Sequence, residues 1–333
     1  MSLRRLSICV LAALAFPAPG LAGVKVSAFF YPWYATASRD GAFVHWSQGG
    51  HGPPDDIAAS YYPARGLYSS TDRLVLGRQM EEIRAAGIDE IAVSWWGSGS
   101  FEDARLPLVA EAARAQGVHV AAHVEPYVDR SVASTVADIG YLRGLGIRRF
   151  YVYRPLDLPL DVWAEANAQL DGVEVLAETG LVGAALRGGF DGVYTYDIVS
   201  FDGGTFARIC AAAHAKGLVC APSVGPGYDA RRGSLDSRVK RRRAGRTYDA
   251  MWRSAIAAGA DRVTITSYNE WHEGTQIEPA AAAGRRGRYR YVSYDGAWGR
   301  RGRDAARAYL DRTAYWSDVF RKTSAAQPKT SAP

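Results

Sequence analysis

The strongest constraint on the fold is a unit that recurs eight times along the chain: an apolar run, a loop, and a stretch with helical spacing. Each apolar run is short and bounded by glycine, proline or polar residues, which indicates a buried strand. The eight runs lie at residues 25–30, 88–94, 118–124, 149–153, 173–177, 192–195, 218–222 and 262–267. Strands that alternate with helices predict an α/β fold with a parallel sheet.

The stretches between these strands have apolar residues at helical spacing. They lie at residues 72–86, 102–116, 132–145, 160–170, 181–187, 205–216, 248–258 and 303–320. Eight strand–helix units favour closure into a single (β/α)8 TIM barrel. The competing fold is an open doubly wound sheet, but no GxGxxG motif follows the first strand. No linker interrupts the pattern, and we expect one domain over residues 23–321.

The two ends of the chain differ from the repeating part. Two arginines precede an apolar run at residues 6–16, and small residues follow at 20–22. This order is typical of a secretory signal peptide, here residues 1–22, and predicts an exported protein, periplasmic or extracellular. Residues 322–333 are mostly Ser, Ala, Thr and Pro, which predicts a disordered tail. No other run is long and apolar enough for a membrane helix.

Part of the formal net charge of +6 comes from runs of arginine and lysine in predicted loops. The runs lie at residues 240–243, 285–286 and 300–301. Such runs bind nucleic acid in some proteins and are solvated loops in others. Tyr289 and Tyr291 alternate with arginines, but two aromatic side chains do not make a base-stacking platform. We expect solvated loops and no nucleic-acid partner.

Cys210 and Cys220 are the two cysteines that follow residue 22. An exported protein can form disulfides, but free cysteine is also common in cores, so the sequence leaves the pairing open. Neither a CxxC motif nor a Cys/His cluster occurs, so we expect no zinc site. The chain also has no phosphate-binding loop, which argues further against an open doubly wound sheet. We expect no cofactor.

Aromatic and acidic residues gather where the predicted strands end. In a (β/α)8 barrel the active site lies at the carboxyl ends of the strands, so these residues are candidates for a binding cleft. Aromatic rings can stack on the apolar faces of sugars, and carboxylates accept hydrogen bonds from hydroxyls. The candidates are Tyr31, Trp33, Trp95, Trp96, His123, Glu125, Tyr127, Tyr228, Asn269, Glu270, Trp271, His272 and Glu273.

Glu270 and Glu273 directly follow the last predicted strand, within the segment NEWHEGTQIEP (residues 269–279). If the chain turns there, side chains three residues apart face the same side. Two neighbouring acids in different surroundings can hold different protonation states, as glycosidic bond cleavage requires. His272 lies between them, and we expect it to tune one acid or to bind a sugar hydroxyl.

Three other interpretations of this segment are weaker. A metalloprotease would have HExxH, but no second histidine follows His272 at that spacing. A calcium loop would have ligands at regular alternate positions, which the segment lacks. A merely solvated loop would seldom contain a tryptophan, whereas Trp271 lies between the two acids.

Several motifs, in order along nearly all of the chain after residue 22, resemble glycoside hydrolase family 99 and family 99-like proteins, the endo-α-1,2-mannosidases and endo-α-1,2-mannanases. The matching stretches are FFYPWY (29–34), HW (45–46), YYPARGLYSSTD (61–72), SWW (94–96), HVEPY (123–127), GPGYD (225–229) and NEWHEGTQIEP (269–279). The last motif is highly specific, and the others gain weight as a series.

The resemblance implies a (β/α)8 barrel, no metal, and cleavage with retention of the anomeric configuration. It implies that Glu270 acts as a base toward the 2-hydroxyl of the sugar and that Glu273 protonates the departing oxygen. In an α-mannoside O2 lies anti to the leaving oxygen, so O2 can attack C1 from the rear and form a 1,2-anhydro sugar. The alternative is a glycosyl-enzyme on Glu270, which would place the two carboxyls about 5–5.5 Å apart.

The resemblance also assigns six strand-end residues to subsites on the non-reducing side of the cut. They are Tyr31, Trp95, His123, Glu125, Tyr127 and Tyr228. Trp96 stands at a position that varies among relatives, and we expect it to separate mannose users from glucose users. The loop at residues 230–246 is unusually basic for this family, so an anionic or modified glycan is an alternative substrate there.

We therefore predict an exported, monomeric, retaining endo-acting glycoside hydrolase that cleaves internal α-1,2-type mannosidic linkages of a glycan or polysaccharide. The alternative is a non-catalytic or biosynthesis-associated barrel that binds a glycan. The acid pair discriminates the two, because a binding protein has no need to keep both Glu270 and Glu273. A nucleic-acid binder that used the arginine runs would instead bind DNA with a steep dependence on salt.

Overall fold

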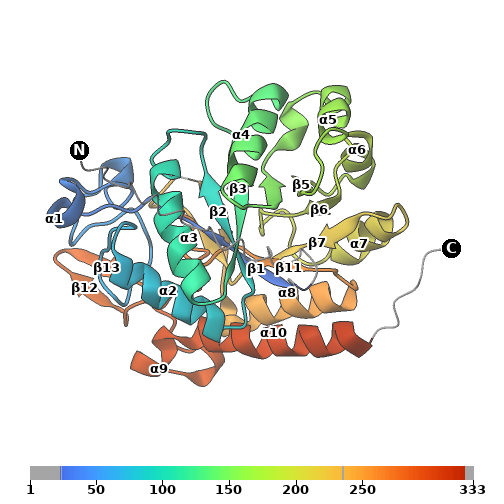
Figure 1. Cartoon of the computed structure of the whole chain (residues 1–333). Coiled ribbons are helices and arrows are strands. Elements are labelled where there is room, and N and C mark those ends of the chain that lie inside the picture. The colour runs from blue at the N-terminus through green and yellow to red at the C-terminus, as the bar shows by residue number, and fades with distance from the viewer. Residues whose placement is uncertain (1–22, 24, 235, 327–333) are drawn as a thin grey trace, which may run out of the picture.

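The computed structural model describes residues 23, 25–234 and 236–326 of the 333-residue chain. The expected signal peptide (1–22) and residues 327–333 of the expected tail lie outside the described residues. The described part forms a ring of parallel strands surrounded by helices (Figure 1). None of the helices in this part is long and apolar enough to cross a membrane.

The main sheet consists of parallel strands. Its two edge strands follow each other directly in the chain and so close the sheet into a barrel. The members are β1 (Val26–Phe30), β2 (Glu90–Trp95), β3 (His119–Val124), β4 (Arg149–Val152), β5 (Glu174–Glu178), β6 (Gly192–Tyr194), β7 (Val219–Ala221), β8 (Ser223–Val224) and β11 (Val263–Ile265). They pair in the order β7-β6-β5-β4-β3-β2-β1-β11-β8. Only Pro222 separates β7 from β8, so the two edges of the sheet meet in one run of chain. The sheet is therefore the (β/α)8 barrel that the sequence predicts.

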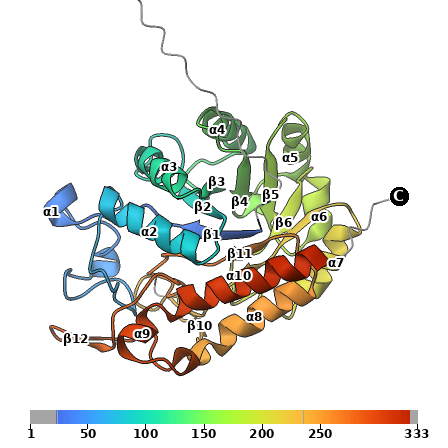
Figure 2. The ribbon, with the colours of Figure 1, turned by 60° about the horizontal axis from the view of Figure 1, so that its bottom comes forward.

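Helices surround the barrel (Figure 2). They are α2 (Arg73–Ala85), α3 (Leu106–Ala115), α4 (Val132–Gly144), α5 (Leu160–Asn167), α6 (Val182–Arg187), α7 (Phe206–His214), α8 (Arg246–Ala257), α9 (Gly302–Ala306) and α10 (Ala308–Ala326). Those up to α8 connect strands that follow one another in the chain, whereas α9 and α10 come after the last strand. The predicted strands and helices are all present. Most of their ends differ from the prediction by one to three residues.

The carboxyl-terminal helix corrects the expected domain boundary. We expected disorder from residue 322, but α10 continues to Ala326. Trp316 and Phe320 are buried in the core and hold this helix against the barrel. Lys322 also pairs with Asp318 one turn earlier, at 2.6 Å, which supports a further turn of helix.

Local chemistry fixes where α2 begins and ends. The Asp72 carboxylate precedes the helix and accepts hydrogen bonds from the backbone N–H groups of Leu74 and Val75. After the helix, Gly87 has φ 71°, a left-handed conformation that favours glycine. A Cβ at Gly87 would lie 2.9 Å from the Cβ of Ser317, so this glycine also lets α10 pack closely.

Charged side chains close the amino end of the barrel. Arg149, at the start of β4, is 2% exposed and contacts the carboxylates of both Glu90 and Glu174. Arg262 lies 3.2 Å from Glu174, and the Ser27 hydroxyl donates to Glu90 at 2.7 Å. Each buried charge therefore has an opposite charge beside it.

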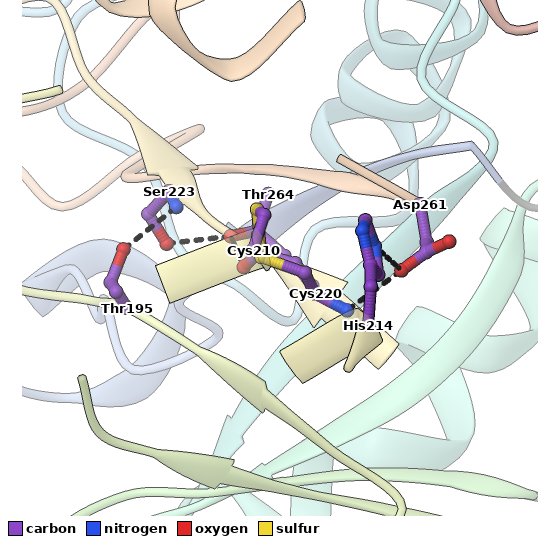
Figure 3. The surroundings of a disulfide bond; sticks show 8 residues. Thr195, Cys210, His214, Cys220, Ser223, Asp261 and Thr264 are labelled. Carbon is purple, nitrogen blue, oxygen red and sulfur yellow. Dashed lines mark hydrogen bonds and ion pairs between the residues drawn. A yellow bond between two sulfur atoms is a disulfide. The ribbon is translucent and has the colours of Figure 1, made fainter. Parts of the chain in front are cut away.

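Cys210 on α7 and Cys220 on β7 form a disulfide bond (Figure 3). The sequence left this pairing open, and the structure decides it. The bond ties α7 to the barrel strand that follows it, at a separation of 10 residues. Beside it, the Asp261 carboxylate accepts a hydrogen bond from the backbone N–H of Cys220 at 2.8 Å and lies 2.9 Å from His214 Nε2.

Two small antiparallel hairpins lie outside the barrel sheet. β9 (Tyr228–Asp229) pairs with β10 (Val239–Lys240), in a segment that we predicted only as part of a basic loop. β12 (Gly284–Arg286) pairs with β13 (Tyr289–Tyr291) after the last barrel strand. In both ribbon views the second hairpin lies on the same side of the molecule as α1 (Ala37–Asp40), which follows the carboxyl end of β1 (Figures 1 and 2). This hairpin therefore extends the carboxyl end of the barrel.

Candidate active site

The loop after β11 carries the acid pair and is fixed by its own backbone. The backbone N–H of Ser267 donates to the carbonyl of Thr275 at 3.0 Å, which closes the loop at its base. The N–H of Glu270 donates to the Ser267 hydroxyl at 2.8 Å. Gly274 has φ 62°, and a Cβ there would lie 3.1 Å from the backbone oxygen of Asp229. The loop is therefore a tight turn, which is the condition that the sequence analysis set for the two acids to face the same side.

Glu270 is 2% exposed and is held on one side by His272. Its Oε1 accepts a hydrogen bond from the backbone N–H of His272 at 2.9 Å and lies 3.3 Å from Nδ1 of the same residue. Nε2 of His272 lies 2.8 Å from the backbone oxygen of His45 and carries the hydrogen, because a carbonyl oxygen only accepts. Of the two roles that the sequence suggested for His272, the contact with an acid is present.

Glu273 lies in the wall of a pocket, and its side chain stays partly exposed. The Tyr196 hydroxyl donates to its Oε2 at 3.1 Å, and the Tyr31 hydroxyl contacts that of Tyr196. Burial and the negative charge of Glu270 raise the pKa of Glu273 well above its usual value, despite the hydrogen bond from Tyr196. Glu273 therefore keeps its proton at a pH where an ordinary glutamate is ionised, as a general acid must.

The pocket beside Glu273 is built from several strand ends. Its lining residues are Tyr153, Tyr196, Asp197, Ile198, Tyr228, Arg238, Thr266, Glu273 and Thr275. Aromatic rings next to carboxyl groups suit a sugar, which has apolar C–H faces as well as hydroxyls. The predicted set lacks Tyr153 and Tyr196, although each lies at the end of a predicted strand, the signal that selected the others.

A second group of predicted residues forms a hydrogen-bonded chain at the ends of β2 and β3. The Trp96 indole donates to the Ser94 hydroxyl at 3.1 Å, and that hydroxyl donates to Oε1 of Glu125 at 2.8 Å. Nδ1 of His123 lies 3.0 Å from the same oxygen, and its Nε2 lies 3.0 Å from the Tyr194 hydroxyl. Trp96 is 36% exposed, so its ring faces outward while Glu125 and His123 lie buried behind it.

Three further aromatic residues of the predicted set lie in different surroundings. The Trp33 ring stacks on His45, with 4.3 Å between ring centres and 10° between planes, so it lies close to the His272 side of the site. Tyr228 lines the pocket beside Glu273. The Tyr127 hydroxyl contacts Asp138 on α4, so its polar end is directed away from that pocket.

Three residues of the predicted set are completely buried. Trp95, Asn269 and Trp271 are 0% exposed. The Asn269 amide clamps the backbone of Tyr31, accepting from its N–H at 2.8 Å and donating to its carbonyl at 3.0 Å. The Trp271 indole donates to Glu278 at 2.9 Å. These three side chains pack against the residues around the acids, and their contact with substrate stays a prediction.

Four arginines of the basic loop bind other groups of the protein. The pairs are Arg231 with Asp229, Arg232 with Asp56, and Arg238 with both Asp197 and Asp236. Arg242 is buried beneath three tyrosine rings and donates to the backbone oxygens of Gly274 and Gln276 at 2.8 and 2.7 Å. These arginines stabilise the loops around the acids, which argues against an anionic sugar at the pocket beside Glu273.

The site therefore combines a carboxyl that retains its proton with a second carboxyl next to it. Such a pair can donate a proton to a departing oxygen and remove one from a hydroxyl. Within the described residues, no group of three or more His, Cys, Asp or Glu side chains is placed to hold a metal ion.

Comparison with known proteins identifies the family of the chain. The model of glycosyl hydrolase family 99 matches residues 23–160 and 163–322. The chain belongs to glycosyl hydrolase family 99. The motif resemblance in the sequence is thereby confirmed, and this family 99 protein is a glycoside hydrolase.

Two relatives and one solved structure illustrate the likeness of the family 99 chain. It is 31% identical to the glycoprotein endo-α-1,2-mannosidase-like protein of Danio rerio, over 88% of this chain and 78% of that one. The glycoprotein endo-α-1,2-mannosidase of Mus musculus is 30% identical, over 89% and 74%. The structure of the GH99 endo-α-mannosidase from Bacteroides thetaiotaomicron matches with a TM-score of 0.81 and 29% identity, over 91% and 99%.

Proposed function

We propose that this family 99 enzyme is an endo-acting mannosidase that cleaves internal α-1,2-type mannosidic linkages in a glycan. The names of its relatives, endo-α-1,2-mannosidases and an endo-α-mannosidase, support this substrate class. The observation that carries the proposal is the raised pKa of Glu273, in a pocket wall and next to Glu270. Two carboxyls in opposite protonation states are what glycosidic cleavage requires.

In the first step Glu270 removes the proton of the 2-hydroxyl while O2 attacks C1 opposite the leaving oxygen. The C1–O bond breaks, and the departing oxygen takes the proton that Glu273 holds. The product on the enzyme is a 1,2-anhydro sugar. The contacts with His272 hold Oε1 of Glu270 in place, and we assign the proton transfer from the 2-hydroxyl to Oε2.

In the second step water attacks C1 and opens the three-membered ring. Glu273, now a carboxylate, takes a proton from the water, and O2 takes back the proton that Glu270 held. Both carboxyls return to their starting states. Two inversions at C1 give net retention of the anomeric configuration.

A substrate without a usable O2 separates this route from a glycosyl-enzyme on Glu270. With hydrogen or fluorine in place of the 2-hydroxyl, the route through O2 cannot begin, whereas direct attack by Glu270 remains open. We expect no turnover of such a substrate by the wild-type enzyme. Turnover with accumulation of a protein adduct at Glu270 would assign the glycosyl-enzyme route instead.

The activity itself is tested with α-1,2-linked mannan and with mannan capped by α-1,3-linked disaccharides. We expect the wild-type enzyme to release oligosaccharides, sized by mass spectrometry. Glu273→Gln should lose hydrolysis of both substrates while it still binds them, because glutamine cannot donate the proton. If the wild-type enzyme binds mannan without cleaving it, the alternative of a glycan-binding barrel is correct.

We also propose that the protein is exported and works as a monomer. The Cys210–Cys220 disulfide supports export, because such bonds persist in oxidising compartments. Cell fractionation of the full chain tests the location, and light scattering of the purified protein tests the oligomeric state. Recovery of the full-length chain in the cytoplasm, with both cysteines reduced, would contradict export.

A further inference from the structure

A second pocket lies under the β12–β13 hairpin. It encloses about 290 Å³ and is lined by Tyr62, Ala282, Gly284, Arg285, Arg286 and Tyr291. It shares no lining residue with the pocket beside Glu273. A volume of this size lies near the lower end of those that hold small ligands. The proposed hydrolysis makes no use of it.

The hairpin concentrates positive charge that the fold leaves without carboxylate partners. Arg285, Arg286, Arg288 and Arg290 are all exposed, and none of the ion pairs among the described residues includes them. Arg285 lies directly opposite Arg290 across the two strands. Like charges in that arrangement destabilise a hairpin. An anion bound beside Arg285 and Arg286 would neutralise part of this charge, whereas Arg231, Arg232 and Arg238 near the acid pocket already have carboxylate partners.

The tyrosines of this pocket have hydroxyls that are already engaged. The Tyr62 hydroxyl donates to the backbone oxygen of Pro54 at 3.2 Å, and the Tyr291 hydroxyl donates to that of Asp55 at 2.7 Å. The Arg286 guanidinium lies over the Tyr62 ring, 3.7 Å from its centre. Guanidinium groups have N–H donors and no acceptor. The side chains therefore offer aromatic faces and donors, which select a ligand that supplies acceptors and negative charge.

We propose that this pocket binds a phosphate or carboxylate group carried by a sugar unit of the glycan. Both groups match the planar fork of a guanidinium. The pocket is joined to the acid-bearing loop, because the Ala281 N–H donates to the Tyr62 carbonyl at 2.7 Å, a few residues after Glu278. The proposal rests on the proposed function only in taking the ligand to be a glycan, and binding at this pocket requires no hydrolysis.

One carboxylate lies close to this pocket and opposes anion binding. Asp55 lies under the turn of the hairpin, where a Cβ at Gly287 would be 3.2 Å from its carboxylate. Burial raises the pKa of the Tyr62 hydroxyl, Arg286 lowers it and Asp55 raises it, so both charges act on this ring. Removing the Asp55 charge is expected to strengthen anion binding, whereas removing the Arg286 charge is expected to weaken it. The test therefore includes one variant for each direction of change in affinity.

The test compares the affinities of three mannans by calorimetry: one neutral, one with phosphate groups and one with carboxylate groups. Glu273→Gln serves as the parent protein, so that hydrolysis does not consume the ligand. We expect the parent to bind at least one anionic mannan about tenfold more tightly than the neutral one, the size of a charge-assisted hydrogen bond. The phosphate and carboxylate arms show which group the pocket takes.

The variants then locate the effect. In the parent background, Arg286→Ala should abolish the preference, Arg286→Lys should keep part of it, and Asp55→Asn should increase it. Arg208→Ala is the matched control, because Arg208 is an exposed arginine on α7, outside the pocket, and has no ion pair within the part of the chain that the structure describes. Equal affinity for all three mannans, or an equal loss in Arg208→Ala, would overturn the proposal. If the parent prefers the anionic mannan but the wild-type enzyme releases no product, the proposed hydrolysis is wrong and the proposed anion site is still supported.

Discussion

The two ends of the barrel both contain buried carboxyl groups, but the fold surrounds them differently. At the amino end, Glu90 and Glu174 lie against Arg149, and Arg262 adds a second positive charge. At the carboxyl end, Glu273 has no arginine or lysine partner among the described residues, and its close charged neighbour is the acid Glu270. The same residue type stabilises one end of the molecule and stays reactive at the other.

The pKa values express this difference. Burial alone would raise the pKa of Glu174, but Arg262 and Arg149 outweigh it and hold the pKa below its usual value. For Glu273, burial and the charge of Glu270 act in the same direction and raise the pKa. A lowered carboxyl pKa adds stability above the unfolded pKa, whereas a raised one removes stability as pH increases. The raised pKa that makes Glu273 a general acid is therefore expected to lower the free energy of unfolding at neutral pH.

The largest expected effect is the loss of activity in Glu270→Gln. Glutamine cannot take the proton of the 2-hydroxyl, so kcat should fall about 10²–10⁴-fold, the usual contribution of a general base. The melting temperature should change little, because the amide can still accept the hydrogen bond from the His272 N–H. Rates on α-1,2-linked mannan and thermal unfolding measure the two quantities. A variant that kept a tenth of the activity would remove Glu270 from the mechanism.

At the amino end the same kind of change should affect stability and not chemistry. Arg149→Met leaves Glu90 buried without a cation and should reduce the free energy of unfolding by about 3–5 kcal/mol, with kcat per folded molecule unchanged. Arg73→Met is the control, because the Arg73–Glu111 pair is exposed and should contribute less than about 1 kcal/mol. Equal losses in the two variants, measured by denaturant unfolding, would contradict the structural role of the buried cluster.

Arg242 is a buried cation at the carboxyl end of the barrel, and it donates hydrogen bonds to backbone carbonyls instead of pairing with a carboxylate. It therefore tests whether a buried arginine at this end positions the catalytic loop. Arg242→Met removes the hydrogen bonds from this guanidinium to the carbonyls of Gly274 and Gln276, of which the second keeps the Tyr294 hydroxyl as a donor. The loss at Gly274 should displace the neighbouring Glu273. We expect kcat to fall about 10²-fold when the leaving group is a sugar, since misplaced catalytic groups lose about that much. A glycosyl fluoride should lose much less, because fluoride departs without a proton. Equal losses on both substrates would assign Arg242 a role in folding only.

The smallest effect is a change in stability with a sign that differs between the two ends. Below about pH 4 Glu273 is protonated in the folded and the unfolded chain. As pH rises, the unfolded chain releases this proton first, so the wild-type protein loses stability until the raised folded pKa is passed. Glu273→Gln should therefore be more stable than wild type at pH 7, on the order of 1 kcal/mol, and equal to it near pH 4.

Glu174→Gln is the matched variant for that measurement. Its lowered pKa means that the ionised form contributes stability above the unfolded pKa and that this contribution is lost as pH falls. The variant should therefore be less stable than wild type at pH 7, and the difference should shrink in acid. Melting curves at a series of pH values test both. If both variants changed the stability at pH 7 in the same direction, the ionised carboxylate would have the same effect on stability at the two ends of the barrel, which would contradict the comparison.

The barrel and the acid loop could be predicted because periodic apolar runs and their order carry that information. The same patterns do not predict whether the side chain of a strand-end residue points into the core or toward the pocket. Trp95 and Trp96 are neighbours, yet the first is buried in the core and the second faces outward. Tyr196 was left out of the predicted site although it donates to Glu273. Sequence position gave the end of the barrel in each case, and only three-dimensional packing selects the side chains that reach the pocket.

Charge pairing is the other feature that the sequence could not supply. The basic loop suggested free arginines near the acids, but Arg231, Arg232 and Arg238 have aspartate partners, some of them distant in the chain. The short hairpins and the Cys210–Cys220 bond likewise depend on which segments the barrel brings together. Composition therefore gives the amount of charge, and the fold determines how much of it stays free.

The central claim is that Glu273 holds a proton because of burial and the charge of Glu270. Carbon-13 NMR of enzyme labelled at the glutamate side-chain carboxyl, with Glu273→Gln used to assign the signal, follows its titration directly. We predict that Glu273 titrates well above the usual value for glutamate in the wild-type protein, and at lower pH in Glu270→Gln. Titration near the ordinary glutamate value of about 4.3, unchanged in Glu270→Gln, would contradict the account.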